Sequence, residues 1–233
     1  MNPERAGDVV VVLAPRGPTD ADDRLLLATA AAWVLGVAPP SVRIERSCPH
    51  CGGTDHGRPL VAVSPGAGSG AGPLHVSLSR AGRSAAFALT FLGPVGIDVE
   101  SVAAVSRAGV DPALFDAVAF GPAELAALSA VPSSDAADAR ARMWTAKEAA
   151  LKCTGDGLRV DPRDLTVGLP GREDPPDVVL TAWRGAGFPV EALRLRGFEP
   201  GAGLVGTVAV LSEDGFAAGG PTVSVVPAAA IRR

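Results

Sequence analysis

The sequence predicts an α+β fold made of two similar halves, and three observations lead to this prediction. In each half of the chain, helical patterning is followed by several segments with strand patterning. The strand segments are short and separated by Gly-containing turns, which favours antiparallel sheets. With 233 residues, 47% hydrophobic and 20% charged, the chain can bury a substantial core. We therefore expect two halves related by pseudo-two-fold symmetry, each a helix plus a small antiparallel sheet.

The predicted N-terminal half covers residues 1–101 and begins with an apolar strand at 9–14. A helix is expected from Thr19 to about Gly36, because threonine is a good N-cap and three aspartates follow it in the first turn. Extended segments are then expected at 42–46, 74–79, 84–91 and 95–100.

The predicted C-terminal half covers residues 102–233. Short helices are expected at 112–119 and 122–130, and a long helix from Ser133 or Ser134 to just before Gly155, a residue suited to a helix C-terminus. The strands of this half are expected at 165–169, 177–183, 193–198, 204–211 and 222–226.

Composition excludes several classes of function. The net charge is −4 and the chain has no basic tail, which argues against a nucleic-acid-binding protein. Three cysteines and no signal-peptide pattern favour a reducing compartment, so we predict a cytoplasmic protein. Separately, we expect it to be a monomer. The longest apolar stretch, Leu25 to Ala38, has 14 residues and ends at two prolines, which is too short to cross a membrane.

A pair of carboxylates closes the third strand segment of the N-terminal half, in the sequence Gly96-Ile97-Asp98-Val99-Glu100. Side chains two positions apart in a strand share a face, so Asp98 and Glu100 point the same way. Two adjacent carboxylates repel each other unless a cation or solvent compensates them. Their oxygens suit Mg²⁺, and a solvated strand end is the alternative.

The long helix contains a second charged cluster between Met143 and Lys152. Glu148 and Lys152 are four positions apart and lie on one helical face, where an ordinary salt bridge would be the simplest interpretation. Of the 21 basic residues, however, only Lys147 and Lys152 are lysines. In a chain that otherwise uses arginine, a retained lysine indicates a compact charge or a proton-transfer role.

These two clusters resemble the signature motifs of the surfactin-type 4′-phosphopantetheinyl transferases. GIDVE at 96–100 is similar to G-[IV]-D-[VI]-E, and WTAKEAALK at 144–152 is similar to W-[ST]-x-K-E-[AS]-x-x-K. Weaker similarities to other family elements occur at Phe120 to Glu124, Gly57-Arg58-Pro59, Ser79-Arg80-Ala81-Gly82 and Arg24.

The resemblance implies an enzyme that binds coenzyme A in the cleft between two α+β halves. It would transfer the 4′-phosphopantetheine arm to a serine of an acyl or peptidyl carrier protein and release adenosine 3′,5′-bisphosphate. Asp98, Glu100 and Glu148 would hold Mg²⁺, with Mn²⁺ as an alternative. Glu148, directly or through a water, would take the serine proton, and Lys152 would stabilise the leaving phosphate. Lys147 would be a second phosphate contact.

The resemblance also implies which side chains contact coenzyme A: Arg24, Arg58, Ser79, Arg80, Lys147 and Lys152. Arg80 stands where the family usually has histidine, so it can bind phosphate with a permanent charge but cannot act as a titrating group. This departure keeps open a protein of the same fold that binds coenzyme A or a carrier protein without catalysis. A metal-dependent phosphohydrolase is a third reading. The sequence does not choose among the carriers of fatty acid, polyketide and nonribosomal peptide synthesis.

A Cys/His cluster precedes Gly57 and raises the question of a zinc site. Cys48 and Cys51 form a Cys-x-x-Cys pair, with His50 and His56 nearby. A second pair of ligands at typical zinc spacing is missing from the sequence. We therefore interpret the cluster as a loop leading into Gly57-Arg58-Pro59, and the sequence leaves zinc binding open.

Overall fold

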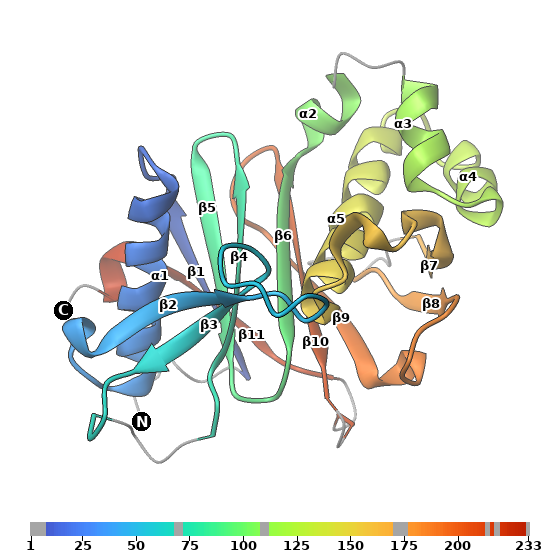
Figure 1. The fold of residues 1–233 in the computed structure, drawn as a ribbon. Coiled ribbons are helices and arrows are strands. Elements are labelled where there is room, and N and C mark those ends of the chain that lie inside the picture. Colours follow the sequence, from blue (N-terminus) through green and yellow to red (C-terminus); the bar gives the residue numbers. More distant parts are fainter. Residues whose placement is uncertain are drawn as a thin grey trace.

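The computed structural model describes residues 8–67, 72–107, 112–169, 177–212, 215–216 and 220–231. Within these residues the strands form a six-stranded, a three-stranded and a two-stranded sheet. Three buried clusters separate four layers: helix α1, the six-stranded sheet, the three-stranded sheet and helix α5. Figure 1 shows α1 and α5 at opposite sides of the strands. The molecule is therefore an α/β/β/α stack.

The six-stranded sheet has the order β11-β1-β5-β4-β3-β2. Helix α1 (Asp20–Leu35) covers one face of it, with the Thr19 side chain accepting from the Asp22 amide as N-cap. The strands are β1 (Val9–Pro15), β2 (Val42–Ser47), β3 (Arg58–Val63), β4 (His75–Ala81), β5 (Ser84–Thr90) and β11 (Val223–Pro227).

Strand β1 is rich in valine because both of its faces are covered, one by α1 and the other by the three-stranded sheet. Val10 and Val12 pack in the cluster beneath α1, whereas Val9 and Val11 pack in the cluster between the two larger sheets. Successive side chains of a strand point to opposite faces, so a strand covered on both faces needs apolar residues at every position.

The three-stranded sheet has the order β6-β10-β9 and is covered by α5 (Ala136–Thr154). Its strands are β6 (Val95–Ser101), β9 (Leu193–Phe198) and β10 (Leu204–Leu211). The small sheet pairs β7 (Leu165–Val167) with β8 (Leu180–Trp183). The remaining α-helices are α2 (Val102–Arg107), α3 (Pro112–Ala119) and α4 (Pro122–Ser129). The 3₁₀ helices are η2 (Pro39–Ser41), η3 (Gly157–Arg159), η4 (Pro162–Asp164), η5 (Val190–Ala192) and η6 (Ala228–Ile231).

Two buried serines on β4 join the two larger sheets. The Ser77 hydroxyl accepts a hydrogen bond from the Ile97 amide at 3.2 Å, and the Ser79 hydroxyl accepts one from the Val99 amide at 3.3 Å. Strand β6 is an edge strand whose unpaired amides need partners. The β4 serines supply these partners and so fix the Asp98 strand against the first sheet.

The α+β class is confirmed, but the pseudo-two-fold symmetry is not. The strands form one six-stranded, one three-stranded and one two-stranded sheet rather than two equal sheets. Strand β11, which comes from the predicted C-terminal half, pairs in parallel with β1 of the other half. Strand β6, placed in the predicted N-terminal half, belongs instead to the second sheet with β10. The sheets therefore do not follow the division of the chain at residues 101 and 102.

Several elements differ from the expectations; strand β8, for example, begins at Leu180 rather than at residue 177. Strand β3 and helix α2 were not expected from the sequence. Helix α5 begins at Ala136 because Ser133 and Ser134 lie in a turn closed by the Asp135 amide and the Pro132 carbonyl, 2.9 Å apart. No helix among the described residues combines the length and hydropathy that a membrane crossing requires.

Candidate functional site

The candidate site forms where α5 lies directly on β6, and Gly96 makes that contact possible. A Cβ atom at Gly96 would lie 1.9 Å from the Ala149 carbonyl oxygen and 2.5 Å from the Cys153 amide nitrogen. Only glycine lets the helix backbone approach so closely. The first glycine of the GIDVE motif thus brings the carboxylates of β6 next to Glu148 and Lys152 on α5.

Asp98 is the centre of a polar network within this contact and is only 3% exposed. Its Oδ1 atom accepts a hydrogen bond from the Lys152 ammonium at 2.5 Å and another from the Ser79 hydroxyl at 2.8 Å. Its Oδ2 atom is buried and has no hydrogen-bond partner in the described part of the chain. A buried carboxylate oxygen without a partner is costly, which marks a position suited to a bound cation or donor.

Glu100 and Glu148 complete the acidic group, and both are half-buried. Burial raises the pKa of Glu100 to about 7, with a further contribution from the Asp98 charge. Burial also raises the pKa of Glu148, against an opposing effect of the Lys152 charge. Burial thus disfavours the charged form of both carboxyl groups, and both lie in surroundings that would favour a bound cation.

A cavity of about 320 Å³ opens beside Lys152. Three of the predicted coenzyme contacts line it, namely Arg58, Arg80 and Lys152. Its volume falls in the range of small-molecule sites, and its cationic lining suits an anionic ligand. Arg24 lies on α1 and is not among the described residues that line this cavity.

The two arginines of the cavity are held by different parts of the fold. Arg80 donates from Nε to Asp23 at 2.5 Å, and its Nη2 atom lies 3.3 Å from Asp20. Arg58 donates from Nη1 to the Cys153 carbonyl at 3.0 Å, so it joins β3 to the end of α5. The α1 aspartates neutralise much of the Arg80 charge, whereas Arg58 faces the cavity without a carboxylate partner in the described residues.

Lys147 does not lie at this site, which corrects its assignment as a phosphate contact. Its side chain is fully buried, and its ammonium donates to Glu124 at 2.6 Å, to the Ala119 carbonyl at 2.8 Å and to the Pro162 carbonyl at 3.0 Å. Three acceptors use the full donor capacity of an ammonium group. Lys147 is therefore a structural residue that ties α5 to the helices beside it.

Two residues of the site were not found from the sequence. Ser77 and Arg46 line the cavity, and Ser77 also binds the β6 backbone. The alternation of Ser77 and Ser79 along β4 could have indicated that polar side chains of this strand bind a neighbouring backbone. Among the described residues, the one compact group of possible metal-ligand atoms comprises Cys48, Cys51 and His56, all within 4.8 Å of one another.

Comparison with known families supports this picture for one segment of the chain. Residues 94–180 match the sequence model of the 4′-phosphopantetheinyl transferase superfamily. This segment is thus similar to transferases of that superfamily, and it contains Asp98, Glu100, Glu148 and Lys152. No curated protein matches the chain.

Three solved structures resemble parts of the fold. A holo-(acyl-carrier-protein) synthase from Bacillus anthracis str. Ames, in complex with CoA (3′,5′-ADP), is 19% identical with a TM-score of 0.40, over 52% of this chain and 95% of that one. The synthase from Neisseria meningitidis is 18% identical with a TM-score of 0.40, over 52% and 98%. A holo-ACP-synthase from Plasmodium yoelii is 17% identical with a TM-score of 0.38, over 51% and 91%.

Proposed function

We propose that this protein is a 4′-phosphopantetheinyl transferase of the surfactin type. It transfers the phosphopantetheine arm of coenzyme A to a serine of an acyl or peptidyl carrier protein and releases adenosine 3′,5′-bisphosphate. The observation that carries the proposal is the meeting of Asp98, Glu100, Glu148 and Lys152 at the α5–β6 contact, beside a cationic cavity. The match of residues 94–180 to the superfamily supports the same chemistry.

The cavity would receive the phosphates of coenzyme A. Arg58 offers guanidinium donors that no carboxylate occupies among the described residues, and Lys152 reaches the same space from α5. Lys152 is bound to Asp98 and lies 3.4 Å from the Ser79 hydroxyl, so its ammonium has a defined position at the edge of the cavity. A positioned cation stabilises negative charge that develops on a leaving phosphate.

The acidic group fits a hard divalent cation, on two observations of this structure. The Asp98 Oδ2 atom is buried without a partner, and the pKa values of Glu100 and Glu148 are raised because burial leaves their negative charges poorly compensated. Asp98, Glu100 and Glu148 would hold Mg²⁺ or Mn²⁺. When bound, such an ion neutralises charge on a pyrophosphate.

Glu148 is the residue that we assign to take the proton of the carrier serine. A general base works best when its pKa lies near the working pH, and burial moves the pKa of Glu148 in that direction. Asp98 does not share this role, because its Oδ1 atom is already bonded to Lys152 and Ser79.

The test is mass spectrometry of several apo carrier proteins incubated with this protein, coenzyme A and Mg²⁺. We expect addition of one phosphopantetheine group to at least one carrier. Asp98→Ala and Glu148→Gln should lower the transfer rate by at least about 10²-fold, the usual effect of losing a general base or a charge-stabilising group. Lys152→Arg should be strongly impaired, since a guanidinium is not a compact point charge.

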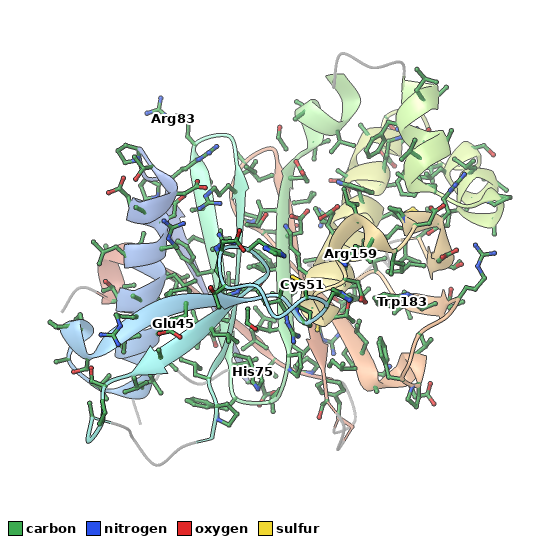
Figure 2. All side chains as sticks on the ribbon, in the orientation of Figure 1. Glu45, Cys51, His75, Arg83, Arg159 and Trp183 are labelled. Carbon is green, nitrogen blue, oxygen red and sulfur yellow. The ribbon has the colours of Figure 1, made fainter. Side chains whose placement is uncertain are left out.

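Glu45→Gln is the matched control, because Glu45 is an exposed carboxylate on β2, and Figure 2 shows it away from the α5–β6 contact. Its transfer rate should equal that of the native chain. Absence of any adduct on a panel of fatty acid, polyketide and peptide carriers would exclude the proposal. A fully active Lys152→Arg variant would contradict the claim that position 152 requires the compact charge of a lysine.

The second candidate is a protein that binds coenzyme A or a carrier without catalysis, favoured by the ion pairs of Arg80 with α1. Titration calorimetry distinguishes the two. Coenzyme A binding with no Mg²⁺-dependent turnover supports the binding protein, whereas turnover supports the transferase. Release of adenosine 3′,5′-bisphosphate without a carrier would instead indicate a phosphohydrolase.

A further inference from the structure

We propose that Cys48, Cys51 and His56 form a zinc site that holds the loop between β2 and β3 against the end of α5. The three side chains lie outside the acidic group of the candidate active site. Thiolate sulfur and imidazole nitrogen are the ligands that zinc prefers, whereas Mg²⁺ prefers oxygen. The chain would thus carry two metal sites of different chemistry.

The ligand atoms are already close to the spacing that a tetrahedral zinc ion requires. With Zn–S near 2.3 Å and Zn–N near 2.05 Å, a tetrahedral angle places sulfur and nitrogen about 3.6 Å apart. The Cys51 Sγ and His56 Nε2 atoms are 3.3 Å apart, and all three ligand atoms lie within 4.8 Å of one another. These separations are close to those of a tetrahedral site.

A carboxylate orients His56 toward the two sulfurs. The Asp55 Oδ1 atom is 2.7 Å from His56 Nδ1, which places the ring proton on Nδ1 and leaves the Nε2 lone pair facing Cys51. Zinc-ligating histidines commonly donate their second ring nitrogen to a carboxylate in this way. Asp55 therefore already holds His56 in the orientation that a zinc ligand needs.

The backbone of the Cys-x-x-Cys turn supports the same arrangement. The Gly52 amide donates to the Cys48 carbonyl at 2.9 Å, and Gly52 has a φ of 69°, a left-handed conformation that glycine adopts without strain. The Gly53 amide donates to the Cys51 sulfur at 3.4 Å. These two contacts fix the backbone between the two cysteines and the position of the Cys51 sulfur.

Exposure indicates how the site would be completed. Cys48 is buried, whereas Cys51 and His56 are exposed, so an ion can enter from solvent and keep a water as its fourth ligand. His50 is not a ligand, because it faces Asp156 at 3.3 Å. Both cysteines are free thiols in this structure.

The site has a mechanical consequence because its loop reaches across to α5. Pro49 packs so closely on Gly155 that a Cβ atom there would come within 3.0 Å of the proline ring, and His50 pairs with Asp156. Figure 2 shows Cys51 on this loop near the middle of the molecule. Arg58 follows the loop and enters the cavity, so the zinc ion would help to position it, a consequence that rests on the proposed function.

Elemental analysis of the full chain, purified with zinc and then dialysed, tests the proposal without using activity. We expect about one zinc per chain. Cys51→Ser and His56→Ala should each lose most of it, while His50→Gln should keep it as the matched control. Cobalt added to the native chain should give thiolate-to-cobalt charge-transfer absorption that is absent from Cys51→Ser.

A chelator-dependent fall of the thermal midpoint in the native chain, absent from Cys51→Ser, would support the stabilising role. Two results would overturn the proposal: zinc retained by both Cys51→Ser and His56→Ala, or a native chain that binds no zinc and contains a Cys48–Cys51 disulfide. Neither result bears on phosphopantetheine transfer, which the carrier assay measures separately.

Discussion

Lys147 and Lys152 are the two lysines of the chain, and they lie five positions apart on α5. Five residues turn about 140° around a helix axis, so their side chains leave the helix on different faces. Lys152 meets Asp98 on β6, whereas Lys147 enters the core toward Glu124. The same residue type thus serves a candidate catalytic site and a buried ion pair within one helix.

Lys147 is expected to matter for stability rather than for the site. Lys147→Met should leave Glu124, with a side chain only 1% exposed, as an uncompensated buried charge and cost about 3–5 kcal/mol in the free energy of unfolding. Urea unfolding measures this loss. The double variant Lys147→Met with Glu124→Gln should recover part of it, because the buried charge is then gone.

Lys152→Met is the contrasting variant. Its side chain is 32% exposed, so solvent reaches the ion pair with Asp98, and Lys152→Met should cost less stability than Lys147→Met even though Asp98 itself is buried. Equal urea midpoints for Lys147→Met and the native chain would contradict the structural role of Lys147.

At the scale of elements, the contact of α5 with β6 decides the geometry of the site. Gly96 allows the contact, the β4 serines hold β6 from the other side, and Arg58 bonds to the Cys153 carbonyl near the helix end. Strand β6 is therefore held between a helix and a second sheet. Asp98 owes its burial to this packing, which Gly96 of the same motif makes possible.

Gly96→Ala tests the contact directly. A Cβ atom 1.9 Å from the Ala149 carbonyl forces α5 away from β6, and the neighbour is backbone that cannot rotate aside. We expect a loss of about 3 kcal/mol in the free energy of unfolding, at the upper end of overpacking effects, together with a loss of transfer activity. Chemical denaturation measures the first and the carrier assay the second.

Gly187→Ala is the matched control, because an added Cβ atom there meets nothing within 4 Å. The urea midpoint of Gly187→Ala should equal that of the native chain. A Gly96→Ala variant as stable as Gly187→Ala would show that the helix can shift without cost, against the close packing described above.

At the scale of the whole molecule, the two predicted halves are interlocked. Strand β11 pairs with β1, and β6 pairs with β10 although β4 also holds it through two serines. The Thr222 amide even bonds to Asp8, 214 positions away in sequence. Each half therefore supplies a strand to a sheet that the other half builds.

Separate fragments of residues 1–101 and 102–233 should consequently fail to fold alone. The first lacks β10 and β11, so β6 loses its sheet and the edge of β1 is uncovered; the second lacks β1 and β6. Neither fragment should show a cooperative thermal transition by circular dichroism, whereas their mixture should regain one. A cooperative transition in the isolated 1–101 fragment would indicate an autonomous domain.

Most elements were predictable from the sequence because their signals are local. Thr19 with its aspartates predicts the start of α1, and β9 and β10 occupy the expected residues 193–198 and 204–211. Strand β3 was missed because Arg58-Pro59 reads as a turn and the strand is stabilised by pairing with β2. Strand alternation, helical spacing and the two retained lysines pointed to Asp98, Glu100, Glu148 and Lys152, and the family resemblance implied their roles.

The amino-acid order was sufficient for the α+β class, for the acidic pair of β6 and for the Glu148–Lys152 face of α5, because each depends on residues only a few positions apart. Lys147 in the core, β11 beside β1 and the gathering of Cys48, Cys51 and His56 required the folded chain. Burial and strand pairing are properties of contacts between distant segments, and side-chain direction within a loop depends on its backbone. A pattern of neighbouring residues does not encode contacts between distant segments or the backbone path of a loop. Only the packing of the folded chain determined these three features.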